Sequence, residues 1–307
     1  KVLVKEIPFD RVTKGGLFVP DNSNYRTIKG EVISIGHDKY IPEGELSIGT
    51  TILYGAHAGT KIKIDRVVYI LLNTVDVYAS QINGKLKVLA SPSIIVEVDK
   101  MYKDHVKMGN VDLFVDPLYN RTHNVKYCGT VVSIPNFEPY DDVDDTRKID
   151  PIIQVGDKVY FKYLATDDDR HLMFKDINDH SEKMTIRVFY PWVFCVVRND
   201  EIIPVGGWCL GEPVIEGEGD MVEMMTESGV STIRVQYFEN SKLIKSTYSE
   251  KDKQKCIVRH IGKFKDYDSE LSIGDVVIGK VINFENNIEG KCYYCFYEES
   301  IDAILTN

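Results

Sequence analysis

The sequence predicts an all-β protein built from three tandem small barrels or sandwiches. Three observations support this prediction. Val, Ile, Tyr and Phe occur in short runs, turn residues separate the runs, and one strand–turn–strand pattern occurs three times. No helical hydrophobic stripe of useful length is present.

The repeated pattern is a turn glycine followed by an apolar strand. Its copies span residues 46–54, 153–161 and 271–279, with the glycine at Gly49, Gly156 and Gly274. Glycine suits such a turn because it adopts positive φ without steric cost. Three copies, each at a comparable distance from a closing strand, are poorly explained by chance.

A second shared element lies upstream of each turn, at residues 30–35, 129–134 and 257–262. Strict alternation places Ile33 and Ile35 on one face of the first copy. The third copy is weaker, because Arg259 stands where an apolar residue is expected.

Each unit closes with a short strand, at residues 75–79, 193–197 and 301–305. The polar stretches that follow, residues 80–84 and 198–201, mark the seams. We therefore expect domains at residues 1–85, 86–199 and 200–307, each large enough to hold its own core.

Composition excludes several classes of partner. The 307 residues carry a formal net charge of −10, which argues against nucleic-acid binding. No stretch approaches the ~20 apolar residues of a membrane helix, and the N-terminal residues do not resemble a secretory signal. The six cysteines are expected to be free thiols in a reducing compartment, so the sequence predicts a cytoplasmic protein.

The first unit carries an ordered series of features. Residues 13–20 contain a glycine pair followed by Leu-Phe-Val, a polar stretch fills residues 21–29, and the strand at 30–35 follows. Tyr54-Gly55 and residues 58–62 come later. This series resembles the GroES co-chaperonin family over nearly all of residues 1–79. The resemblance implies a small irregular β-barrel that assembles into a ring and caps a chaperonin cylinder.

The same resemblance implies a partner-binding loop. Carried over by position, its residues are Gly15, Gly16, Leu17, Phe18 and Val19. Burying the three apolar side chains favours docking by ~1.5–3 kcal/mol each, whereas ordering the loop costs ~1–2 kcal/mol per residue. One loop is therefore expected to bind weakly and several loops on one ring to bind firmly. The alternative is that Leu17, Phe18 and Val19 form a buried strand of their own barrel.

The other two units depart from the family pattern. Leu113, Phe114 and Val115 echo the tripeptide, but they follow a single glycine, Gly109. They are either a second docking loop or a strand or fixed loop. The counterpart in the third unit, residues 221–255, is long and polar and is either a hairpin or an insertion that serves contacts between subunits.

Three barrels per chain do not divide the seven barrels of the family's rings. Either the first unit alone joins the ring, or three barrels lie side by side in a ring of six or nine. The predicted partners are accordingly a chaperonin ring and further copies of this chain. The alternative function is a non-enzymatic structural ring or virion assembly protein.

The sequence predicts no catalytic residue, metal site or cofactor. It has no dinucleotide-binding G-x-G-x-x-G between a strand and a helix, and no phosphate-binding G-x-x-x-x-G-K-[ST]. Cys292 and Cys295 form its one C-x-x-C pair. On a strand these positions point to opposite faces, which favours core thiols over a zinc site.

Overall fold

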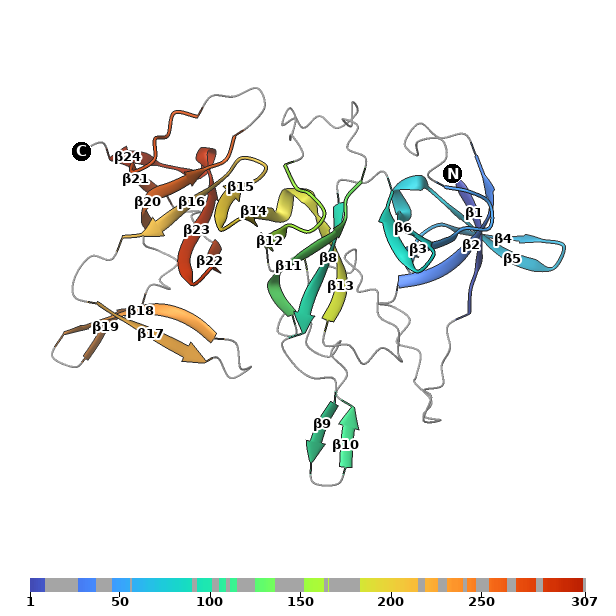
Figure 1. Cartoon of the computed structure of the whole chain (residues 1–307), viewed down its shortest axis with the longest axis horizontal. Helices are drawn as coiled ribbons and strands as arrows, with labels where there is room; N and C mark the ends of the chain where they lie inside the picture. Colours follow the sequence, from blue (N-terminus) through green and yellow to red (C-terminus); the bar gives the residue numbers. More distant parts are fainter. Residues whose placement is uncertain are drawn as a thin grey trace. The chain divides into compact units, whose positions relative to one another are not determined.

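The computed structural model describes residues 1–8, 27–36, 46–55, 57–89, 93–100, 105–108, 111–114, 125–135, 152–162, 165, 183–214, 219–225, 231–239, 242–246, 254–263, 269–279 and 284–305. These residues form antiparallel strands and three short 3-10 helices, with no α-helix among them (Figure 1). No helical segment of the described chain is long and apolar enough to cross a membrane.

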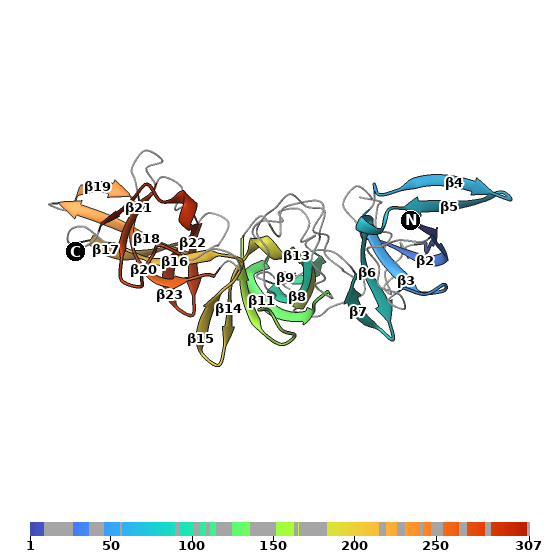
Figure 2. The same ribbon diagram turned by 90° about the horizontal axis from the view of Figure 1, so that it is seen from above.

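The first sheet has seven strands in the order β4-β5-β1-β2-β3-β6-β7. They are β1 (Val2–Glu6), β2 (Thr27–Ile35), β3 (Thr51–Gly55), β4 (Thr60–Ile64), β5 (Val67–Leu72), β6 (Val77–Ile82) and β7 (Lys85–Val88). Figure 2 shows the β4–β5 hairpin extending away from the rest of this sheet.

The second and third sheets have six strands each, in the orders β13-β8-β11-β12-β14-β15 and β22-β23-β16-β20-β21-β24. The second comprises β8 (Ser93–Lys100), β11 (Val125–Ser133), β12 (Lys158–Phe161), β13 (Lys183–Phe189), β14 (Val193–Arg198) and β15 (Glu201–Pro204). The third comprises β16 (Trp208–Pro213), β20 (Gln254–Ile261), β21 (Val276–Gly279), β22 (Phe284–Ile288), β23 (Lys291–Tyr297) and β24 (Ala303–Leu305).

The same five-strand order occurs in all three sheets, as β5-β1-β2-β3-β6, β13-β8-β11-β12-β14 and β23-β16-β20-β21-β24. A 3-10 helix precedes the closing strand each time, at Thr74–Asp76, Tyr190–Trp192 and Glu298–Ser300. The prediction of an all-β chain with three tandem small β domains is therefore confirmed.

The predicted glycine turns are closed by the same hydrogen bond in each sheet. The backbone N–H groups of Gly49, Gly156 and Gly274 donate to the carbonyls of Val32, Val131 and Val258, each at 2.8 Å. The three glycines have φ of 85°, 96° and 101°, a region that favours glycine. The turn thus fixes the second strand against the third at one register in all three repeats.

The alternation expected for residues 30–35 is interrupted by a β-bulge. Val4 pairs with Val32 and Leu3 with Ser34, so Ile33 is an extra residue in β2. Val132 and Arg259 are the extra residues at the same point of β11 and β20. Bulged residues leave the regular ladder, and Val132 and Arg259 are exposed. An apolar residue is therefore not required at Arg259, which donates instead to Glu212 at 2.6 Å.

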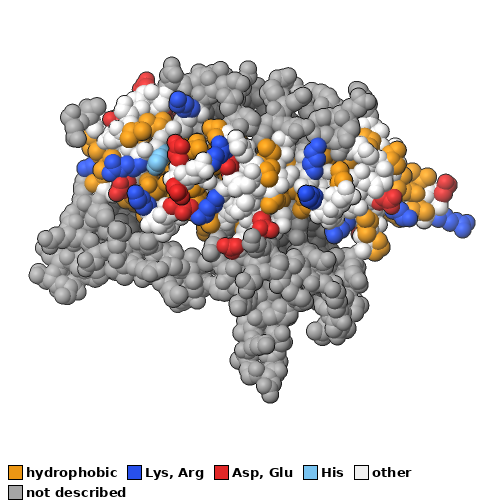
Figure 3. Space-filling view, in the orientation of Figure 1, with side chains coloured by type: hydrophobic (Ala, Val, Ile, Leu, Met, Phe, Trp, Pro, Cys, Tyr) orange, Lys and Arg blue, Asp and Glu red, His pale blue; other side chains and the backbone are white. Residues whose placement is uncertain are grey.

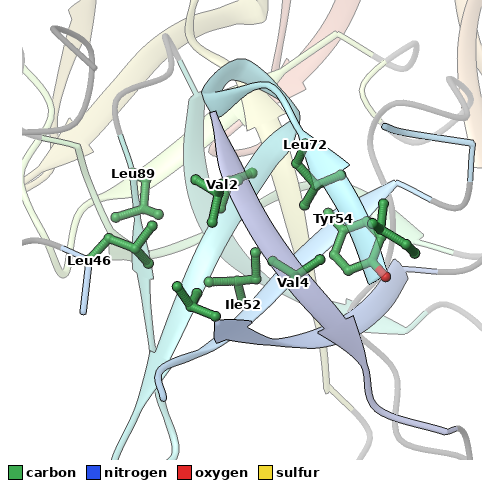
Figure 4. Packing of buried hydrophobic residues seen from close by; sticks show 10 residues of the cluster. Val2, Val4, Leu46, Ile52, Tyr54, Leu72 and Leu89 are labelled. Atoms are coloured by element: carbon green, nitrogen blue, oxygen red, sulfur yellow. The ribbon is translucent and has the colours of Figure 1, made fainter. Parts of the chain in front are cut away.

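The core of the first sheet lies between β1, β3 and β5. Buried apolar side chains from these strands and their flanking segments point toward one another (Figure 4). They include Val2, Val4, Leu46, Ile52, Tyr54, Leu72 and Leu89. In the third sheet the corresponding cluster includes Cys209, Cys256, Val258, Leu271, Val277, Tyr294 and Phe296.

The chain divides into two compact units, residues 1–142 with 153–193 and residues 143–152 with 194–307. The first of these two compact units holds the whole of the first sheet and most of the second sheet. The division falls inside β14, so it does not follow one of the predicted seams. The domain boundaries at residues 85/86 and 199/200 stay a prediction.

Candidate partner-binding sites

The segment predicted to dock a partner is carried by β1 and β2. These strands pair side by side, with Glu6 opposite Gly30. Just beyond β1, the N–H of Ile7 donates to the carbonyl of Lys29 at 2.8 Å. Residues 9–26 therefore leave and re-enter the sheet at neighbouring positions. Gly15, Gly16, Leu17, Phe18 and Val19 lie within this segment and outside the described residues.

Tight packing holds the base of that segment. A Cβ at Gly30 would lie 3.0 Å from Cε1 of Tyr54 and 3.3 Å from Cβ of Val4. Tyr54 is fully buried, and its hydroxyl has no hydrogen-bond partner among the described residues. Burial, and secondarily the charge of Glu6, raise the pKa of this phenol. A side chain at position 30 would therefore need the Tyr54 ring and Val4 to move apart from β2 by a few tenths of an ångström.

The second predicted segment contains a strand. β9 (His105–Met108) and β10 (Val111–Phe114) form a two-stranded ribbon in the stretch between β8 and β11. Leu113 pairs with Val106 and Phe114 with His105, whereas Val115 lies outside the described residues. Docking by Leu113, Phe114 and Val115 stays a prediction.

The third counterpart forms its own small sheet. β17 (Gly219–Met225), β18 (Ser231–Glu239) and β19 (Lys242–Ser246) pair as a meander in the stretch between β16 and β20. Each repeat thus connects its first two long strands by a different element: a segment of 18 residues, a ribbon or a three-stranded sheet.

Sequence reasoning missed an exposed apolar hairpin in the first sheet. Ile64, Val67 and Val68, at the β4–β5 turn, are 44%, 38% and 53% exposed. Figure 3 shows apolar side chains at the surface of this hairpin, next to acidic and basic side chains at its tip. The adjacent Val67-Val68 pair could have indicated it, because neighbouring residues of a strand point to opposite faces and one of them meets solvent in a projecting hairpin.

Sequence reasoning also missed the way in which consecutive sheets pack. Leu53, Ala79 and Val88 of the first sheet form one buried cluster with Ile95 of β8. The Val88 N–H donates to the hydroxyl oxygen of Ser133, at the end of β11, at 3.1 Å. The β6–β7 hairpin of the first sheet therefore covers part of the second sheet.

The charged side chain in this junction is Arg187, which is 8% exposed. Its guanidinium lies 4.3 Å from the centroid of the Tyr78 ring, in a cation–π contact. Tyr78 belongs to β6 and Arg187 to β13, so this contact also joins the first sheet to the second.

The β14–β15 hairpin packs on the third sheet in a comparable manner. The rings of Phe194, in β14, and Trp208, in β16, meet edge to face at 4.7 Å. Trp208 in turn stacks on Tyr297 at 3.9 Å. Burial, and secondarily the Cys195 thiol of β14, raise the pKa of the Cys295 thiol. A hairpin thus covers the following sheet twice within the chain.

The cysteines are all free thiols, and four of them are buried. Burial raises the pKa of Cys209 to about 11 and that of Cys256 to about 12. In the C-x-x-C pair, Cys295 is fully buried and accepts from the Asn286 amide at 3.8 Å, whereas Cys292 is half-buried. Across the described parts of the chain, no three His, Cys, Asp or Glu side chains gather in a way that could hold a metal ion.

Comparison with known proteins bears on the first sheet and the segment it carries. The family model for the chaperonin 10 kDa subunit matches residues 1–81. The co-chaperonin GroES of Bacteroides thetaiotaomicron is 35% identical over 79 residues, which cover 26% of this chain and 88% of that protein. The co-chaperonin GroES of Trichlorobacter lovleyi is 36% identical over 84 residues and is also covered to 88%.

The match therefore includes almost the whole of each relative but only the first quarter of this chain. It spans β1, the segment at residues 9–26, β2, the glycine turn and the closing strand β6, which are the features that the sequence analysis identified. Through these residues, the chain belongs to the GroES co-chaperonin family.

Proposed function

We propose that this chain is a co-chaperonin that docks on a chaperonin ring through Leu17, Phe18 and Val19. The observation that carries the proposal is the position of residues 9–26. These residues connect the paired strands β1 and β2 in the region similar to co-chaperonins, and the Ile7–Lys29 hydrogen bond joins the two ends of the connection. A segment anchored at both ends on a rigid sheet can present a short apolar sequence to a partner.

The energetics of such a contact require several copies. Burying Leu17, Phe18 and Val19 contributes roughly 1.5–3 kcal/mol each, and ordering the surrounding residues offsets much of that gain. Gly15 and Gly16 increase the ordering cost because glycine loses the most backbone freedom. Self-association of the chain raises the effective concentration of the tripeptide, so we propose that it acts as part of a ring.

The proposed role needs no catalytic residue, metal or cofactor from this chain. Its six thiols are of the kind that a reducing compartment maintains, and we propose the cytoplasm as its location. Leu113, Phe114 and Val115 are proposed as a weaker second contact, since only Gly109 precedes them closely.

Substitution of the tripeptide tests the proposal. Leu17→Asp and Phe18→Asp are expected to weaken binding to a purified chaperonin ring at least tenfold in the presence of ATP, because a carboxylate is costly to bury in an apolar groove. Co-sedimentation with the ring measures binding, and recovery of a refolded substrate enzyme measures function. Val68→Asp is the matched control, since it places the same charge at an exposed apolar position of the same sheet.

Unchanged binding by both tripeptide variants would overturn the proposal. A wild-type chain that assembles with itself but binds no chaperonin under any nucleotide condition would favour the structural-ring alternative.

A further inference from the structure

The bulge and the glycine turn define equivalent positions in the three sheets. Immediately after each bulge, one residue of the first long strand pairs with one of the second: Leu3 with Ser34, Ile95 with Ser133, and Leu210 with His260. The same first-strand residues pair on their other side with Leu71, Arg187 and Cys295. We call these three sets of three residues the receiving face of each sheet.

The receiving face is covered in the second and third sheets. Ile95, Ser133 and Arg187 are 0%, 7% and 8% exposed beneath the β6–β7 hairpin. Leu210 and Cys295 are fully buried on the sheet that the β14–β15 hairpin covers. The receiving face is thus covered twice within the chain, once by the β6–β7 hairpin and once by the β14–β15 hairpin.

In the first sheet the receiving face has no such cover among the described residues. Leu3 and Leu71 are partly exposed and Ser34 is exposed. The first sheet has leucine where the second sheet has Ile95 and Arg187. Its Ser34 occupies the position at which Ser133 of the second sheet accepts a hydrogen bond.

The strands at the other end of the five-strand order show the complementary difference. Leu53 and Ala79 are cross-strand partners on β3 and β6, and both are buried against Ile95. Their counterparts in the third sheet, Ile278 and Ala303, are likewise cross-strand partners. We call this the covering face.

The covering face of the third sheet lies open in the part of the chain that the structure describes. Ile278 is partly exposed, Ala303 is exposed, and Leu305, two residues along β24, is 41% exposed. β24 is also the edge strand of its sheet. An open apolar face on an edge strand is an interaction surface.

We propose that the covering face of the third sheet in one copy packs on the receiving face of the first sheet in a second copy. We take a second copy as the occupant because each of the two junctions inside the chain already packs the covering face of one sheet on the receiving face of the next sheet. The inference deepens the proposed function by naming the surfaces through which the chain would associate. A head-to-tail interface of this kind closes into a ring or extends into a filament.

The consequence for stoichiometry is specific. Three sheets of each chain would lie consecutively in the assembly, so the number of barrels would be a multiple of three. Each group of three would contribute one Leu17-Phe18-Val19 sequence, because the second and third sheets carry different elements at that place.

Native mass measurement of the full chain without a chaperonin tests the interface. The wild type is expected at multiples of the 35.0 kDa chain mass. Ser34→Arg, on the receiving face, and Leu305→Arg, on the covering face, are each expected to shift it to the single-chain mass. Both replace exposed side chains, so the fold should tolerate them. Ile48→Arg, at a 71% exposed turn position of the first sheet, is the matched control and should leave the assembly unchanged.

Mixing the two variants tests the head-to-tail geometry. Each retains one intact face, so a mixture of Ser34→Arg and Leu305→Arg is expected to form a dimer of one copy of each and nothing larger. The two blocked faces carry the same charge and cannot pair with each other. A wild type that stays a single chain at micromolar concentration, or folded variants that form no mixed dimer, would overturn the proposal.

The two proposals fail separately. Unchanged chaperonin binding by Leu17→Asp and Phe18→Asp, with a wild type that assembles as expected, would contradict the docking loop and leave the interface intact. A single-chain wild type that still binds the chaperonin would contradict the interface alone.

Discussion

The backbone N–H of Val88 donates a 3.1 Å hydrogen bond to the hydroxyl oxygen of Ser133, a residue of the next sheet. Val88 is fully buried and Ser133 is 7% exposed. The bond lies beside the apolar contact of Ala79 with Ile95. Because a buried N–H without a partner is costly, this serine hydroxyl helps to fix the first sheet against the second.

Ser133→Ala should therefore loosen this junction. Loss of the acceptor is expected to lower the local free energy of opening by about 1–3 kcal/mol. Amide hydrogen exchange at Val88 measures the effect directly, as an increase of about tenfold or more. Ser34→Ala, which removes the equivalent but exposed hydroxyl of the first sheet, is the control and should leave the exchange at Val88 unchanged. Equal exchange in the two variants would contradict a structural role for this bond.

In the third sheet, the glycine and the larger residue that faces it have changed strands relative to the first two sheets. In the first two sheets the glycine lies on the second long strand, at Gly30 and Gly129, against Val4 and Val96. In the third sheet the glycine lies on the first long strand, at Gly211. A Cβ there would collide with Sγ of Cys256 and approach Cε1 of Phe296 to 3.1 Å.

A double-mutant cycle on this pair is expected to show coupling. Gly211→Val alone should destabilise the third sheet by about 3 kcal/mol through overpacking, and Cys256→Gly alone by about 1–2 kcal/mol through a cavity and backbone freedom. The double variant restores the arrangement of the first two sheets and should recover about 1–3 kcal/mol of the summed loss. Denaturant unfolding of the full chain measures all four species, and simple additivity would contradict the exchange.

Local patterns in the sequence predicted a large part of the fold. Gly49, Gly156 and Gly274 marked the turns because a positive φ favours one residue type strongly. The closing strands were predictable for a similar reason, since short apolar runs followed by polar stretches are typical of strands. The bulge at Ile33 was not predictable, because a bulge adds one residue without a required side chain, as Arg259 at the same position shows.

The junctions between sheets escaped sequence reasoning for a different reason. Ile95 and Leu210 resemble core residues of their own sheets, and nothing local distinguishes a side chain that packs on a neighbouring hairpin. Their role becomes visible only when Leu3, at the same position of the first sheet, is seen to be partly exposed. The family resemblance predicts Leu17, Phe18 and Val19 as partner-binding residues; they lie outside the described residues, so this stays a prediction.

Thiol reactivity should separate the cysteines into two groups. Burial raises the pKa of Cys209 to about 11 and of Cys256 to about 12, and Cys195 and Cys295 are fully enclosed. Thiolate is the reacting species, so these four should resist iodoacetamide at pH 8 in the native chain. Cys128 and Cys292 are partly exposed and should be alkylated first. Peptide mass spectrometry gives the order, and early labelling of Cys256 would contradict the described packing of the third core.

Protonation of His260 should destabilise the third sheet as the pH falls. This half-buried side chain meets the Tyr293 ring edge to face at 5.7 Å. Burial, and secondarily Lys291, hold its pKa below the ordinary value of 6.5, whereas Glu201 acts in the opposite direction. As the pH falls below about 6.5, the unfolded chain binds the proton before the folded chain does. The free energy of unfolding should therefore decrease from pH 7 toward pH 5.

His260→Gln is expected to flatten that decrease, which denaturant titrations at several pH values would show. A proton NMR titration of the imidazole gives a second, direct readout and should place the pKa of His260 below 6.5. Glu201→Gln should lower that pKa further, because it removes the nearby negative charge, and Lys291→Gln should raise it. A measured pKa at or above 6.5 in the folded wild type would contradict the partial burial of this β20 histidine against the Tyr293 ring.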